Sequence, residues 1–96
     1  MELLQLLQEK RDEILRIAAA HKATNVRVFG SAARGDADEA SDVDFLVDFG
    51  SGSGLLDYAA LVRELEALLG CEVDVVGEKA LKQRFRDRVL REARAL

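Results

Sequence analysis

Residues 26–49 read VRVFGSAARGDADEASDVDFLVDF, and this stretch decides the fold. It holds two apolar, β-branched runs, Val26–Phe29 and Asp42–Phe49, and each of them predicts a strand. The dipeptide Gly30-Ser31 breaks the first run, and ten residues separate it from Asp42-Val43-Asp44. A small-residue turn can hold phosphate, and two carboxylates so placed can hold a divalent metal. The stretch therefore predicts chemistry on a nucleoside triphosphate.

The flanking residues predict the remaining elements. Apolar residues recur near the helical period in residues 2–20, in Leu55–Leu69 and in Glu78–Ala95, whereas Cys71–Val76 alternates as a strand does. In the final helix we expect Leu81 and Phe85 to face the core. The expected order is helix 2–20, strand 26–29, a short helix with Ser31 as its N-cap, polar loop 35–41, strand 42–49, helix 55–69, strand 71–76 and helix 78–95. This order predicts an α/β (α+β) fold with one small mixed sheet flanked by helices. A parallel crossover between the last two strands is allowed but not required.

Length and charge narrow the function classes. A chain of 96 residues forms one domain, residues 1–96, and its composition of 49% hydrophobic and 33% charged residues is that of a globular protein. No apolar stretch approaches the length of a membrane span, and the N-terminus does not resemble a signal peptide. One cysteine, Cys71, predicts a reducing, cytoplasmic setting. The net charge of −4 argues against independent binding to nucleic acid.

Asp42 and Asp44 form the first part of a candidate site. They lie two residues apart on a strand, so their side chains leave the same face about 7 Å apart. At an effective dielectric constant near 20, two charges at this distance repel by about 2 kcal/mol. The pair therefore needs a counterion, which can be Arg27, Arg34 or a divalent cation. Ligands that are all oxygen favour Mg²⁺ or Mn²⁺.

Asp74 has the same phase in the third strand. If the second and third strands are neighbours, Asp74 can join Asp42 and Asp44, and three carboxylates are enough for a two-metal site. The turn at Gly30-Ser31 supplies the other half, because glycine lets the backbone approach a ligand and free N–H groups can hold phosphate oxygens. The triphosphate would then lie between the turn and the metals.

Residues 26–35, VRVFGSAARG, followed by residues 41–47, SDVDFLV, closely resemble the signature of the DNA polymerase β-like nucleotidyltransferase superfamily. That signature is Gly-Ser, ten residues, Asp-x-Asp and a third Asp on a later strand, where Asp74 fits. The small size and the closing stretch at 88–93, RVLREA, are similar to the minimal nucleotidyltransferase branch. The resemblance implies a palm-like nucleotidyltransferase core.

The resemblance also implies a reaction and a partner. Members of this branch transfer AMP from ATP to a hydroxyl group, using two Mg²⁺ ions with Mn²⁺ as the alternative, and release pyrophosphate. They act as antitoxins that modify a tyrosine of a HEPN-domain RNase toxin. This chain would then be a protein adenylyltransferase that forms a hetero-oligomer with such a toxin.

By position, the resemblance assigns roles to six residues. Asp42 and Asp44 would bind both metals, and Asp74 would bind one metal and help to deprotonate the attacking hydroxyl. The triphosphate would be held by Gly30 and Ser31. Arg34 would contact phosphate or brace the acidic loop, and we favour bracing.

Three other interpretations remain open. A polymerase or a tRNA-adding enzyme needs more protein to hold a template or a primer, so a protein or small-molecule acceptor is favoured. A binding module would neutralise a toxin by contact alone, through the final helix or through Leu55–Leu69. A metal-dependent hydrolase could use the same carboxylates, but it would leave Gly30-Ser31 without a role.

Overall fold

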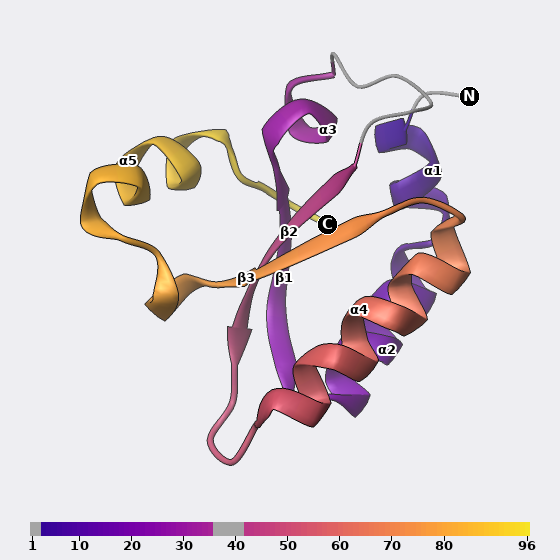
Figure 1. The fold of residues 1–96 in the computed structure, drawn as a ribbon. Coiled ribbons are helices and arrows are strands. Elements are labelled where there is room, and N and C mark those ends of the chain that lie inside the picture. Colours follow the sequence, from indigo (N-terminus) through magenta and orange to yellow (C-terminus); the bar gives the residue numbers. More distant parts are fainter. Residues whose placement is uncertain (1–2, 36–41) are drawn as a thin grey trace.

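The computed structural model describes residues 3–35 and 42–96 (Figure 1). Over these residues the chain forms one small mixed sheet flanked by helices, as the sequence predicts, but the sheet has a fourth strand that the sequence does not predict. None of the described helices combines the length and the apolar character needed to cross a membrane. The elements in chain order are α1 (Leu3–Glu9), α2 (Arg11–Ala20), β1 (Ala23–Phe29), α3 (Gly30–Arg34), β2 (Val43–Phe49), α4 (Leu55–Leu69), β3 (Val73–Gly77), the 3₁₀ helix η1 (Glu78–Ala80), α5 (Gln83–Glu92) and β4 (Arg94–Ala95).

The sheet has the strand order β3-β2-β1-β4. β1 pairs antiparallel with β2 and with β4, whereas β2 and β3 are parallel. A parallel pair needs a crossover connection, and α4 supplies it. The register places Phe29 opposite Asp44 and Asp44 opposite Asp74. The neighbouring strands on which the three-carboxylate hypothesis depends are therefore present.

The hydrophobic core lies on one face of the sheet, under α1, α2 and α4 (Figure 1). Alternate residues of β2 point into it, because successive side chains of a strand leave opposite faces. The fully buried large side chains of this core are Leu7, Ile14, Val28, Val43, Phe45, Val47, Leu61 and Leu65. On the opposite face, Leu46 is also fully buried, but Asp44 is only partly covered. One face thus stabilises the domain and leaves the other free to form a site.

The predicted helix 2–20 is two helices that meet at Lys10. Helical hydrogen bonds still cross the junction, from Lys10 N–H to the Leu6 carbonyl at 3.0 Å and from Ile14 N–H to the Lys10 carbonyl at 2.9 Å. Leu7 and Ile14 are both fully buried on either side of it. The junction is therefore a bend that keeps both side chains in the core.

The predicted helix from Glu78 to Ala95 is confirmed only over Gln83–Glu92 and is wrong at both ends. Lys82 and Ala93 have extended backbones that bound α5, and the chain ends in β4, which pairs with β1. The Leu96 N–H extends this pairing to the Val26 carbonyl at 3.1 Å. A long-range strand pairing thus overrides the local helical period.

The predicted core positions of this segment are also corrected. No residue of α5 is buried, Phe85 is 45% exposed, and Leu81 precedes α5 and is half-buried.

Two leucines of α4 test this division between core and surface. Leu61 is fully buried and Leu56 is 87% exposed on the same helix. We expect Leu61→Ala to lower the free energy of unfolding by about 2–5 kcal/mol, because it leaves a cavity. Leu56→Ala should change it by less than about 0.5 kcal/mol, as is usual for surface positions. Urea denaturation followed by circular dichroism measures both, and similar losses for the two variants would contradict this core.

Candidate active site

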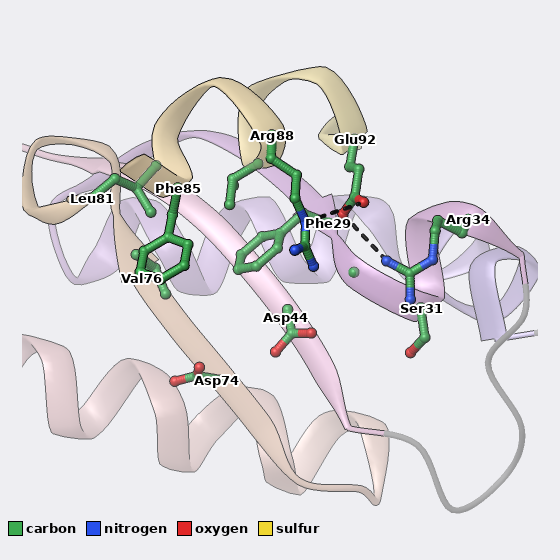
Figure 2. Close-up of a pocket in the computed structure, with 12 residues that line it drawn as sticks. Phe29, Ser31, Arg34, Asp44, Asp74, Val76, Leu81, Phe85, Arg88 and Glu92 are labelled. Atoms are coloured by element: carbon green, nitrogen blue, oxygen red, sulfur yellow. Dashed lines mark hydrogen bonds and ion pairs between the residues drawn. The ribbon is translucent and has the colours of Figure 1, made fainter. Parts of the chain in front are cut away.

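A cavity of about 550 Å³ lies between α5 and the face of the sheet opposite the core (Figure 2). This volume is within the range of sites that bind small molecules. The sheet and α3 provide one side and the segment from Leu81 to Glu92 provides the other. The residues that line the cavity are Phe29, Gly30, Ser31, Arg34, Asp44, Asp74, Val76, Leu81, Phe85, Arg88, Val89 and Glu92.

Asp44 and Asp74 lie side by side on the floor of this cavity. They are register partners on the parallel strands β2 and β3, which places their backbones about 4.8 Å apart. Figure 2 shows both carboxylates on the open side of the sheet. Asp42 lies just before β2, is exposed and is not among the lining residues. The structure therefore brings two of the three predicted carboxylates into the cavity and leaves the third outside its lining, although close enough to act electrostatically on Asp44.

The pKa of Asp44 is raised above its ordinary value. Burial is the main cause, because it disfavours the charged form, and the negative charges of Asp74 and Asp42 raise the pKa further. The positive charge of Arg34 acts in the opposite direction. The carboxylates thus repel one another in a partly buried setting, which favours the arrival of a cation.

Gly30 makes room for the Asp44 carboxylate. Its φ of +71° is one that glycine adopts readily and that other residues avoid. A Cβ atom at this position would lie 2.5 Å from Asp44 Oδ2, which is closer than van der Waals contact. The turn after β1 and the acidic strand β2 are therefore fitted to each other.

Ser31 lines the cavity, but it does not have its predicted role as the N-cap of the short helix. That helix, α3, begins at Gly30, and its cap position is Phe29, whose side chain makes no capping hydrogen bond. The difference arises because Phe29 remains paired with Asp44 at the end of β1, and the chain turns at Gly30. Ser31 lies one residue inside the helix.

Arg34 interacts both with α5 and with Asp44. Arg34 Nη1 donates to Glu92 Oε2 of α5 at 3.3 Å, and Arg34 also acts electrostatically on Asp44. The predicted bracing of the acidic loop by Arg34 involves residues 36–41, which lie outside the described residues.

Arg27 is not the counterion of Asp42 and Asp44, contrary to one of the predicted options. Arg27 Nη2 donates to Asp48 at 3.2 Å, and Nη1 donates to Glu78 at 3.1 Å. The reason is that η1 carries Glu78 close to β1, a proximity that the sequence does not reveal.

The donor set is compatible with Mg²⁺ but does not form a complete cage. In residues 3–35 and 42–96, no three acidic, histidine or cysteine side chains are gathered closely enough to hold a metal without further ligands. Mg²⁺ is usually bound by one or two carboxylates together with substrate phosphates and water. Asp44 and Asp74, with Asp42 at the edge, match that pattern. The site is thus suited to a metal that arrives with a phosphate ligand.

The α5 side of the cavity was missed by sequence reasoning. Leu81, Phe85 and Val89 recur at four-residue steps, and this stripe predicts a core-facing helix. In the structure the stripe faces the cavity instead. The large excess of basic residues around the stripe was the available signal, because a core helix of so small a domain has few charges near its buried face.

Comparison with known proteins matches the nucleotidyltransferase domain family to residues 7–96. The protein adenylyltransferase MntA of Thermococcus cleftensis is 45% identical over 89 residues, which cover 84% of this chain and 90% of that protein. A candidate protein adenylyltransferase of Methanocaldococcus jannaschii is 41% identical over 87 residues, or 91% of this chain and 94% of its own length.

Solved structures agree with these matches. A candidate minimal nucleotidyltransferase has a TM-score of 0.88 and 52% sequence identity, covering 97% of this chain and 95% of that one. A toxin–antitoxin structure with AMP-PNP has a TM-score of 0.75 at 20% identity, covering 88% and 69%, and this likeness concerns the fold alone.

Gly30→Ala tests the fit between the turn and Asp44. Gly70, at the end of α4, has the same φ of +71°, but a Cβ atom there would meet nothing within 4 Å, so Gly70→Ala is a matched control. Strain in the left-handed region should lower the free energy of unfolding of each variant by about 1–2 kcal/mol. Gly30→Ala should lose about 1–3 kcal/mol more, because the new methyl group overlaps Asp44.

Urea denaturation measures these losses. Adding Asp44→Ala to Gly30→Ala should remove the extra loss. Equal losses at positions 30 and 70 would show that Asp44 does not press on Gly30.

Asp44→Asn tests the electrostatic repulsion in the metal-free protein. A raised pKa means that the folded state holds the Asp44 proton more tightly than the unfolded state. Wild-type stability therefore falls as the pH rises from the ordinary value of 3.8 through the raised pKa. The uncharged amide should make the variant more stable than the wild type at pH 7, with a smaller advantage as the pH is lowered toward 4.

Thermal unfolding between pH 4 and pH 7 measures this difference. Asp12→Asn is the control, because the Asp12 side chain is 89% exposed. An Asp44→Asn advantage that stayed constant with pH would contradict the assignment.

Proposed function

The chain belongs to the nucleotidyltransferase domain family, and within this family we propose that it transfers AMP from ATP to a hydroxyl group of a partner toxin protein. One observation carries the proposal. Asp44 and Asp74 lie side by side in the same cavity as the Gly30-Ser31 turn, so two carboxylates suited to a metal and a turn suited to phosphate line one cavity. The protein adenylyltransferase name of the relative from Thermococcus cleftensis supports AMP as the transferred group and a protein as the acceptor.

We assign the triphosphate to the α3 end of the cavity. The Gly30-Ser31 turn lines this end, and the Ser31 hydroxyl and the Arg34 guanidinium can donate to phosphate oxygens. Arg34 is paired with Glu92, so it is already held at the cavity edge. This assignment gives the small-residue turn a role that a simple hydrolase would not need.

We assign two Mg²⁺ ions, or Mn²⁺, to Asp42, Asp44 and Asp74. When bound, the metals would neutralise phosphate charge and lower the pKa of the attacking hydroxyl. Asp44 is suited to this role because its carboxylate is fixed between Gly30 and Asp74. Asp42 is free to complete the site from the edge, since it is exposed beside the first residue of β2.

The transfer itself balances without a further reactant. The hydroxyl oxygen of the acceptor forms a bond to the α-phosphorus of ATP, and the bond from that phosphorus to the bridging oxygen of pyrophosphate breaks. The Asp74 carboxylate receives the hydroxyl proton, because it lies beside Asp44 and farther from the phosphate-binding turn. Pyrophosphate then leaves from the Gly30-Ser31 end.

We propose that the acceptor is a tyrosine of a HEPN-domain toxin, so that the modification neutralises the toxin. The family resemblance and the toxin–antitoxin structures with a similar fold support this choice of partner. The net charge of −4 favours a protein over a nucleic acid as acceptor.

Neutralisation by contact alone is the second candidate. It is favoured by Leu55 and Leu56, which are 80% and 87% exposed at the start of α4 and would suit a protein interface. In that case the carboxylates would have no catalytic role.

Labelled ATP separates these functions. The chain is incubated with α-labelled ATP, Mg²⁺ and the protein encoded beside it in its genome, and transfer to the partner and pyrophosphate release are measured. Asp42→Ala/Asp44→Ala should lower partner labelling by more than about 100-fold, because it removes metal ligands. Asp48→Ala should retain it, since Asp48 is on the same strand but pairs with Arg27 outside the cavity.

The other outcomes decide against the proposal in distinct ways. Undiminished labelling by the double variant would remove the carboxylates from catalysis. If neither protein labels the partner but both inhibit its RNase activity, the chain acts by contact. If free phosphate is released instead of pyrophosphate, the chain is a hydrolase.

A further inference from the structure

Phe85 is an aromatic side chain that packs in no core. It is 45% exposed, and among the described residues only Leu55 and Leu56 are also large, hydrophobic and exposed. Unlike those two leucines, Phe85 lines the cavity. Burial of Phe85 in the core would stabilise the domain. Its partly exposed position on a cavity wall therefore indicates contact with a ligand.

The cavity has two chemically different ends. Gly30, Ser31 and Arg34 line one end, and Val76, Leu81 and Phe85 line the other. Asp44 and Asp74 lie between them on the floor, as Figure 2 shows. A nucleoside triphosphate has the same division, because a polyanion and a flat, largely apolar base are joined through a sugar.

Arg84 gives the Phe85 ring a second feature of a stacking platform. Its guanidinium carbon lies over the ring, 4.7 Å from the centroid, which is a cation–π contact. Arg84 is exposed and is not a lining residue, so it covers the ring from outside the cavity. The contact covers one face of the ring, so a stacked ligand would use the other face.

We propose that Phe85, together with Val76 and Leu81, binds the nucleobase of the triphosphate by stacking. This inference rests on the proposed function and deepens it, because it assigns the base to the wall formed by η1 and α5. The base is joined to the phosphates through the sugar, so it must bind close to them. The wall that carries Phe85 lines the same cavity as the Gly30-Ser31 turn. The acceptor hydroxyl must also reach the α-phosphorus beside Asp74, so the binding and labelling measurements below distinguish a base from an acceptor at this wall. Stacking on a phenyl ring tolerates any base, so selectivity among bases is not part of this wall.

Binding measurements with two ligands test the proposal. Isothermal titration calorimetry gives the dissociation constants of ATP and of inorganic tripolyphosphate, each with Mg²⁺, for the full chain. Phe85→Ala should weaken ATP binding by roughly 5- to 150-fold, which is the loss expected for one stacked base. Tripolyphosphate binding should not change, because it has no base. Phe85→Trp should retain ATP binding, and Leu56→Ala, which removes an exposed apolar side chain outside the cavity, should behave as the wild type.

Each other outcome overturns the proposal. If Phe85→Ala binds ATP as tightly as the wild type while the wild type still labels its partner, the base lies elsewhere and the proposed function stands. If ATP binding is unchanged but partner labelling falls, the ring holds the acceptor. If Phe85→Ala weakens the binding of ATP and of tripolyphosphate equally, Phe85 stabilises the fold and does not bind the base. If the wild type binds neither ligand, the proposed function fails as well.

Discussion

The contact between the Asp44 carboxylate and the backbone of Gly30 is the constraint on which the site depends. Gly30 ends β1 with a left-handed φ, and the absence of a side chain lets the carboxylate of the neighbouring strand occupy the vacated space. That carboxylate is partly buried beside Asp74, and both conditions disfavour its charge. The domain therefore keeps a local electrostatic repulsion in this cavity, and perturbed charges of this kind are common at functional sites.

The parallel pairing of β2 and β3 turns this contact into a site. The α4 crossover allows the two strands to run in the same direction, and their register places Asp74 beside Asp44. The same alternation that points these carboxylates to the cavity points Val43, Phe45 and Val75 to the core. Because these three inward residues are apolar and fully or nearly fully buried, the core can hold the carboxylates in place despite their repulsion. A one-residue slip of either strand would exchange the two faces.

The sequence predicts the features that depend on local pattern and misses those that depend on distant partners. Period-2 alternation located β2 and β3, the Gly-Ser break located the turn, and Leu55–Leu69 matches α4 at both ends. The prediction for the final segment fails for two reasons. The apolar stripe of Leu81, Phe85 and Val89 has the same four-residue spacing in a core helix and in a cavity wall. In addition, β4 forms only by pairing with β1, which is distant in the sequence. The sequence allows Arg27 as a counterion of Asp42 and Asp44, but in the structure Arg27 pairs with Glu78 of η1. The strand phase predicts that Asp44 and Asp74 lie together, as they do, but it does not predict that Asp42 lies outside the cavity lining.

The anchoring of α5 explains how a helix without a buried residue can form a cavity wall. It is held at its ends: Arg27 pairs with Glu78 of η1 before the helix, Arg34 pairs with Glu92 in its last turn, and β4 joins β1 directly after it. Such partly exposed ion pairs each contribute little, on the order of 1 kcal/mol or less. α5 has no fully buried residue to add to these contacts, so we expect this wall to be less stable than the core helices. A ligand in the cavity would contact the apolar side chains of this wall. Its binding free energy would then stabilise the folded state directly. On the proposed function, substrate binding would therefore stabilise this wall as well as position the reacting groups.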